Sequence, residues 1–137
     1  MYLNMIKISA ILILSFVCSM TSWAQQPKLV PHPIHLKNGK QFSLNLPANF
    51  EIIPAAEGLK RVRFFAQAPD RRMFVTDMYD LTDNKKGTVY ILDDWNADTG
   101  KFGKIIPYLT GLRNPNSVQF YTDVLEQDWL YLAETHQ

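Results

Sequence analysis

The chain has 137 residues, of which 14 are Lys or Arg, 13 are Asp or Glu, and one is cysteine. This length suits one domain, and the near-neutral charge argues against a nucleic-acid or anionic-membrane partner. The cysteine, Cys18, lies in an N-terminal segment predicted to be removed, so the exported form would have no disulfide to stabilise it.

Residues 1–24 are predicted to be a signal peptide. Lys7 precedes an apolar run at residues 8–17, and Ser22-Trp23-Ala24 places small residues at positions −3 and −1 of a cleavage site. The run is too short to span a bilayer, which needs about 20 apolar residues. The alternatives are a buried helix, a membrane anchor and a lipoprotein signal at Cys18. We therefore expect a periplasmic or secreted protein without a stable membrane anchor, beginning at Gln25.

Residues 25–40 are expected to form a leader and a hairpin turn. Residues 25–33 are polar, contain proline and show no periodicity. Residues 34–36 and 41–46 flank Asn38-Gly39, which is the strongest short hairpin signal because both residues tolerate positive φ. A short strand is predicted next, at residues 50–53.

Four strands are then predicted, at residues 62–67, 73–77, 88–92 and 104–110, with loops at 79–87 and 93–103. In the first of these strands, alternation places Val62 and Phe64 on one face and Phe65 on the other. Pro107 cannot donate a hydrogen bond to a neighbouring strand, so the fourth strand is predicted to be an edge.

The first two of these strands recur later in the chain. Val62-Arg63-Phe64-Phe65 returns as Val118-Gln119-Phe120-Tyr121 with an offset of 56 residues, and residues 73–77 return as 130–134 with an offset of 57. The two offsets predict one inserted residue between the strands. A recurring unit of short strands is typical of a β-propeller or another repeat array.

The predicted fold class is all-β, an incomplete β-propeller of about one and a half four-stranded blades plus an N-terminal hairpin. Such a fragment would be partly unfolded, or would self-associate through the open sheet edge at residues 129–134. A small free-standing β-sandwich is the alternative fold, and the incomplete second repeat argues against it.

The order and spacing of these pieces resemble the six-bladed propeller of the pyrroloquinoline-quinone-dependent glucose and sorbosone dehydrogenases. The resemblance covers most of residues 41–137, as the N-terminal portion of such a propeller. The matching motifs are Leu46-Pro47-Ala48-Asn49-Phe50-Glu51-Ile52, Ala68-Pro69-Asp70, Met73-Phe74-Val75-Thr76-Asp77, Gly87-Thr88-Val89-Tyr90, Gly111-Leu112-Arg113-Asn114-Pro115 and Leu130-Tyr131-Leu132-Ala133-Glu134-Thr135. Two positions depart from the family: Arg71 stands where glycine is usual, and Asn116 where histidine or glutamine is common.

The resemblance implies an exported sugar or aldehyde dehydrogenase that uses pyrroloquinoline quinone and calcium. In such enzymes a histidine base takes the substrate hydroxyl proton while hydride moves to the quinone, and arginine and asparagine bind the cofactor. We expect this chain alone to be inactive and not to bind the quinone, because it carries no convincing base, and no catalytic residue is assigned. The alternative is part of a non-catalytic exported propeller that serves as a binding or scaffold module.

Arg113 and Asn114 are the candidate cofactor-binding residues. A quinone with three carboxylates needs cationic, planar donors, and the resembling enzymes carry an Arg-Asn-Pro of this form in a later blade. The favoured alternative is a structural connector that starts the next strand. His136 is a second, weaker candidate for a role in the propeller funnel.

No metal site is predicted. His32 and His35 have an H-x-x-H spacing but no third ligand nearby, so both are expected to be exposed to solvent. Residues 94–100 have the oxygen-ligand spacing of a calcium loop at Asp94, Asn96 and Asp98, yet Thr99 and Ile105 stand where such a loop needs glycine and glutamate. Asp77, Asp80 and Asp83 are expected only to keep their loop solvated.

Overall fold

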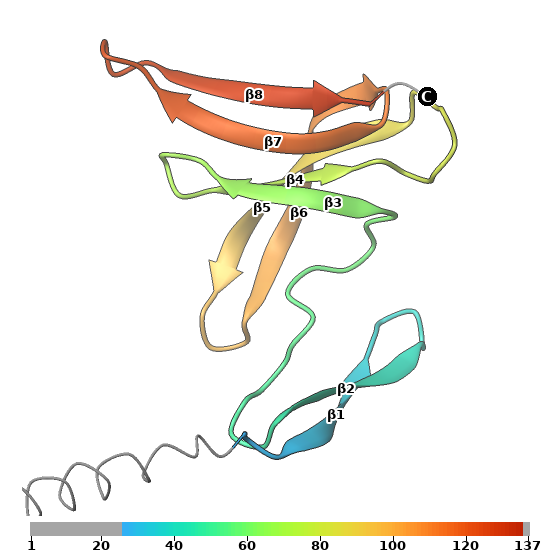
Figure 1. Cartoon of the computed structure of the whole chain (residues 1–137). Coiled ribbons are helices and arrows are strands. Elements are labelled where there is room, and N and C mark those ends of the chain that lie inside the picture. The colour runs from blue at the N-terminus through green and yellow to red at the C-terminus, as the bar shows by residue number, and fades with distance from the viewer. Residues whose placement is uncertain (1–25, 136–137) are drawn as a thin grey trace, which may run out of the picture.

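The computed structural model describes residues 26–135, which form eight β-strands and no helix (Figure 1). The strands make three antiparallel sheets, ordered β1-β2, β3-β4-β5-β6 and β7-β8. The all-β prediction is therefore confirmed for this part of the chain, and it contains no helix able to cross a membrane. The predicted signal peptide and His136 lie outside the described residues.

The predicted N-terminal hairpin is present. β1 (Leu29–His35) pairs with β2 (Gln41–Pro47), and in the turn Gly39 adopts a φ of 82° and donates its N–H to Leu36 O at 3.0 Å. β1 begins earlier than expected, because residues 29–33 are strand and not an unstructured leader. Both strands of a two-stranded sheet are edge strands. Proline is tolerated in an edge strand, because its missing N–H can face solvent instead of a neighbouring strand.

The strand predicted at residues 50–53 does not form. In residues 48–61, which link β2 to the strand that begins at Val62, the hydrogen bonds go to separate partners: the backbone Ala55 O accepts from Phe102 N at 2.9 Å, and the side-chain Glu57 Oε2 accepts from Lys37 N at 2.7 Å. Isolated bonds of this kind hold the segment against β6 and the first hairpin without building a ladder.

The central sheet contains the four predicted strands in chain order. They are β3 (Val62–Gln67), β4 (Met73–Asp77), β5 (Gly87–Asn96) and β6 (Lys101–Leu112). β6 is an edge strand, as Pro107 predicted, and the β5–β6 register shifts just where Pro107 pairs with Tyr90. The prediction of a loop at residues 93–103 was wrong, because β5 and β6 extend into these residues. Trp95 pairs with Phe102 there, and their ring centroids lie 4.8 Å apart.

A bulge in β3 overturns the predicted face of its aromatic residues. The β3–β4 register shifts between Val62 and Phe65, and Thr76 Oγ1 accepts a hydrogen bond from Phe64 N at 3.1 Å within the irregular stretch. The extra residue places Val62 and Phe65 on the same face, where both line one groove. Simple alternation had placed them on opposite faces.

The last two strands pack against one face of the central sheet. β7 (Pro115–Thr122) and β8 (Asp128–Glu134) form the third sheet, which lies beside β3 and β4 in Figure 1. The buried cluster between the sheets comprises Ala68, Phe74, Val89 and Ile91, with Leu112, Phe120, Leu130 and Leu132 packed against it. The hydrophobic core of the described residues is thus a contact between two sheets.

The strand–turn–strand repeat is real, but its offset differs from the predicted one. In the β3–β4 turn Ala68 N donates to Arg72 O and Arg71 N to Ala68 O; in the β7–β8 turn Asp123 N donates to Gln127 O and Glu126 N to Asp123 O. Arg71 and Glu126 both have positive φ, at 73° and 60°. The two turns are therefore equal in length and 55 residues apart, and the predicted inserted residue is absent.

Candidate functional site

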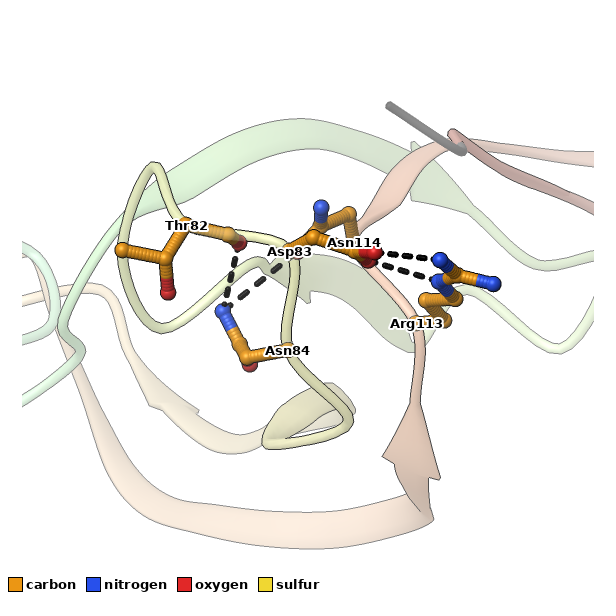
Figure 2. A network of polar contacts seen from close by, with 5 residues as sticks. All are labelled: Thr82, Asp83, Asn84, Arg113 and Asn114. Carbon is orange, nitrogen blue, oxygen red and sulfur yellow. Dashed lines mark hydrogen bonds and ion pairs between the residues drawn. The ribbon is translucent and has the colours of Figure 1, made fainter.

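The candidate cofactor residues lie where two loops meet at one end of the central sheet. The β4–β5 loop, residues 78–86, lies beside the connector from β6 to β7, residues 113–114 (Figure 2). Gly87 allows this approach: a Cβ built there would lie 2.2 Å from Pro115 Cδ and 2.8 Å from Leu112 O. Only glycine fits, so the sequence fixes the loop and the connector against each other.

Arg113 is held by a carboxylate of the neighbouring loop. Its Nε donates to Asp83 Oδ1 at 2.6 Å and its Nη2 donates to Asp83 Oδ2, the two-point pairing shown in Figure 2. The side-chain hydrogen bond to Asp83 raises the pKa of Arg113 above its ordinary value. The backbone N of Arg113 also donates to the Glu134 carboxylate of β8. The positive charge of the Arg113 guanidinium is thus already paired with the Asp83 carboxylate.

Asn114 is enclosed by the structure. The residue is 1% exposed and adopts a φ of 49°, in the left-handed region that asparagine tolerates. Its Oδ1 accepts from Asn84 Nδ2 at 3.4 Å, and its backbone O accepts from Thr135 N at 3.1 Å. Its buried Nδ2 has no hydrogen-bond partner among the described residues. Asn114 is therefore buried at the turn into β7, and its amide does not face solvent.

The loop opposite is ordered by a second carboxylate. Asp80 Oδ1 accepts from the Thr82 hydroxyl at 2.6 Å, from Thr82 N at 2.8 Å and from Asn84 Nδ2 at 2.8 Å. The hydroxyl hydrogen bond, followed by the backbone one, lowers the pKa of Asp80 below its ordinary value. Asn84 Nδ2 also lies 2.9 Å from Thr82 O. Because the same nitrogen contacts Asp80 Oδ1 and Asn114 Oδ1, Asn84 links Asp80 to Asn114 across the cluster.

The expectation that Asp77, Asp80 and Asp83 only keep their loop solvated was wrong, because Asp83 pairs with Arg113, Asp80 orders the loop and Asp77 is buried. Asp77 is buried at the end of β4, where its carboxylate accepts from Lys60 N at 2.7 Å and from Arg61 N and Tyr79 N at 2.8 Å. Three backbone donors aimed at one buried carboxylate stabilise the entry to β3 and the exit from β4. This aspartate is structural.

The residues considered as metal ligands do not converge. His32 and His35 lie three positions apart in β1, so their side chains point to opposite faces of that strand. His35 is exposed as expected, whereas His32 is half-buried. Asp94 Oδ2 lies 3.8 Å from Lys104 Nζ, and Asn96 Oδ1 accepts from Thr99 N at 3.0 Å. Within residues 26–135 no three His, Cys, Asp or Glu side chains form a metal-binding group.

The polar cluster around Arg113 and Asn114 therefore joins the β4–β5 loop to the β6–β7 connector. The sequence predicted Arg113 and Asn114 as candidates, and the structure shows that Asp83 and Asn84 are their partners. The signals for the second half were the repeated Asx-turn patterns of the loop, where Asp80 caps Thr82 and Asn84 Oδ1 accepts from Lys86 N.

Comparison with protein-family models, with curated proteins and with solved structures finds no match for this chain.

Proposed function

We propose that the chain belongs to an exported β-propeller protein of the kind that the quinone-dependent glucose and sorbosone dehydrogenases represent, and that residues 26–135 form a structural part of it. The fold supports this proposal. A four-stranded antiparallel meander, β3 to β6, is followed by a repeat of its first two strands, β7 and β8, which packs on one face of the meander. This arrangement is what one propeller blade and the start of the next require.

The observation that carries the structural role is the Arg113–Asp83 pair. Two guanidinium nitrogens of Arg113 already donate to Asp83, so a quinone carboxylate would have to compete with that pair. Asn114 beside it is buried. The two residues that the sequence nominated do not fit pyrroloquinoline quinone, so we assign them to the connector, and we assign no reaction step to this part of the chain.

The test is a direct assay of the purified chain. It is mixed with pyrroloquinoline quinone, calcium, an artificial electron acceptor and a panel of aldoses and aldehydes, and quinone binding is measured separately by equilibrium dialysis. We expect no turnover above a blank and no retained quinone. Turnover or binding that disappears in Arg113→Ala would contradict the structural assignment, and His136 would then be the next residue to substitute.

A second candidate is a non-catalytic exported propeller that acts as a binding or scaffold module. The observation that favours it is an apolar groove on the face of the central sheet opposite β7 and β8. Both candidates expect this chain to retain neither quinone nor free sugar, so the dialysis tests them together, and the apolar groove is the observation that favours the second.

A further inference from the structure

One face of the central sheet is apolar and uncovered. We call it the groove face and define it by six residues: Val62, Phe65, Met73, Val75, Leu92 and Phe102. They line a groove of ≈ 390 Å³ that Ala55, Ala56 and Leu59 border on one side. Phe65 is 70% exposed there. An apolar concavity of this kind on a sheet face marks an interaction site.

The β7–β8 sheet also has an uncovered face, and it is aromatic. Tyr121 pairs with Trp129 and Gln119 with Tyr131, all four on the side that faces away from the central sheet. Tyr131 is 59% exposed, and Tyr121 and Trp129 are also exposed. We call these four residues the aromatic face. Exposed aromatic residues of this density are typical of the centre of a protein–protein interface.

The internal repeat relates the two uncovered faces. Since the two turns match at an offset of 55, Trp129 is the equivalent of Phe74, and Phe120 is the equivalent of Phe65. Within the chain Phe74 packs on Phe120 with ring centroids 4.8 Å apart. The same contact made between two copies would pack Trp129 of one copy on Phe65 of the other.

The charges near the two faces are complementary. The turn at residues 123–127 carries Asp123 and Glu126 and no basic residue, and it stands at the end of the aromatic face. Arg71 lines the groove that continues from the groove face beside Trp95, with a volume of ≈ 560 Å³. In the repeated arrangement the acidic turn of one copy lies next to the turn that carries Arg71 in the other.

We propose that the chain self-associates head to tail, with the aromatic face of one copy seated on the groove face of the next. The interaction repeats between copies the packing that β7 and β8 make with the central sheet inside one copy. Because the two faces differ, an open assembly keeps one free groove face at one end and one free aromatic face at the other, so copies continue to add as a filament unless a ring closes. This inference does not depend on the enzymatic resemblance.

The test uses two charge-blocking variants of the full chain. Phe65→Lys blocks the groove face and leaves the aromatic face intact, whereas Trp129→Lys does the reverse. We expect wild-type chains to increase in mass with concentration between about 1 µM and 1 mM in analytical ultracentrifugation, the range of a weak to moderate contact. Each variant alone should stay monomeric. An equimolar mixture of the two should give a complex of twice the monomer mass that grows no further.

Four results would contradict head-to-tail association. The first is a wild-type chain that stays monomeric at every concentration. Dimers of Trp129→Lys alone would indicate a symmetric groove-to-groove contact, and unchanged association of Phe65→Lys would indicate pairing through the β8 edge. A mixture of variants that forms no complex would also contradict it.

Two controls keep the test decisive. Phe42→Lys, at a 47% exposed position in the first hairpin, should associate like the wild-type chain. If far-UV circular dichroism shows that Phe65→Lys or Trp129→Lys is misfolded, Val62→Lys and Tyr131→Lys replace them as the variants that block the two faces. Raising the salt concentration should weaken association, since the acidic turn and Arg71 are exposed charges.

Discussion

The ring of Phe74 packs against the ring of Phe120 at an angle of 70°, with centroids 4.8 Å apart. This contact joins β4 of the central sheet to β7 of the third sheet. Tyr108 of β6 approaches the same ring at 5.2 Å and 87° from within the central sheet, so Phe74 contacts one aromatic ring of its own sheet and one of the third sheet. Edge-to-face pairs of this kind contribute stability beyond the area that they bury.

Phe74→Ala should therefore be the most damaging single truncation among the described aromatic residues. Phe74 is 3% exposed, and removal of a buried phenylalanine side chain costs about 3–5 kcal/mol of unfolding free energy. Urea unfolding at a fixed protein concentration measures it, because association also changes apparent stability. Phe42→Ala in the first hairpin is the control. Equal losses in the two variants would show that the intersheet contact does not stabilise the fold.

Acid should release the β4–β5 loop. The Thr82 hydroxyl and backbone hydrogen bonds lower the pKa of Asp80 below its ordinary value of 3.8. A carboxyl whose folded pKa is lowered contributes stability above its unfolded pKa, and that contribution is lost as the pH falls below 3.8 through the folded pKa. The amide resonance of Thr82, followed by NMR during an acid titration, should shift with a midpoint below that value. Asp80→Asn should abolish the transition, and a midpoint above 3.8 would contradict the prediction.

The sequence predicted the features that depend on local chemistry. The hairpin turn at Asn38-Gly39 formed, with Gly39 at positive φ and Asn38 Oδ1 accepting from Lys40 N at 3.0 Å. The edge position of β6 followed from Pro107, which has no N–H to donate. The all-β class followed from short alternating runs without helical periodicity. Each of these rests on a few neighbouring residues.

The features that the sequence did not predict depend on contacts between distant segments. The β3 bulge adds one residue between Val62 and Phe65, and a shift of one residue moves every later side chain to the other face. Motif similarity alone aligned Phe64 with Phe120, whereas the turn hydrogen bonds align Phe65 with it. Strand periodicity carries no signal for such a bulge.

The candidate site shows the same limit. Arg113 was correctly placed in a connector, but its partner Asp83 lies 30 residues earlier in the chain. Nothing in the local sequence of either residue indicates that they pair. The burial of Asp77 was missed for the same reason, because two of its three donors come from residues 60 and 61, before β3.

Export should remove residues 1–24. The prediction rests on Lys7, the apolar run and the small residues Ser22 and Ala24, and the cleavage site requires a small residue at position −1. N-terminal sequencing of the secreted product should begin at Gln25, and Ala24→Phe should leave the segment attached. Soluble cytosolic protein with an intact Met1 would overturn it.

Gly87→Ala should separate the β4–β5 loop from the β7 connector. The added Cβ would lie 2.2 Å from Pro115 Cδ and 2.8 Å from Leu112 O, and neither backbone nor ring can move without shifting the connector. Overpacking of this kind costs about 1–3 kcal/mol. Gly103→Ala is the matched control, because its Cβ would meet the exposed side chain of Asp94, whose carboxylate oxygen at 2.6 Å can rotate away and whose Cβ lies at 3.2 Å. Urea midpoints should fall for Gly87→Ala alone, and the loss should shrink when Pro115→Ala is added. Equal midpoints for the two glycine variants would show that the close approach of Gly87 to Pro115 does not constrain the connector.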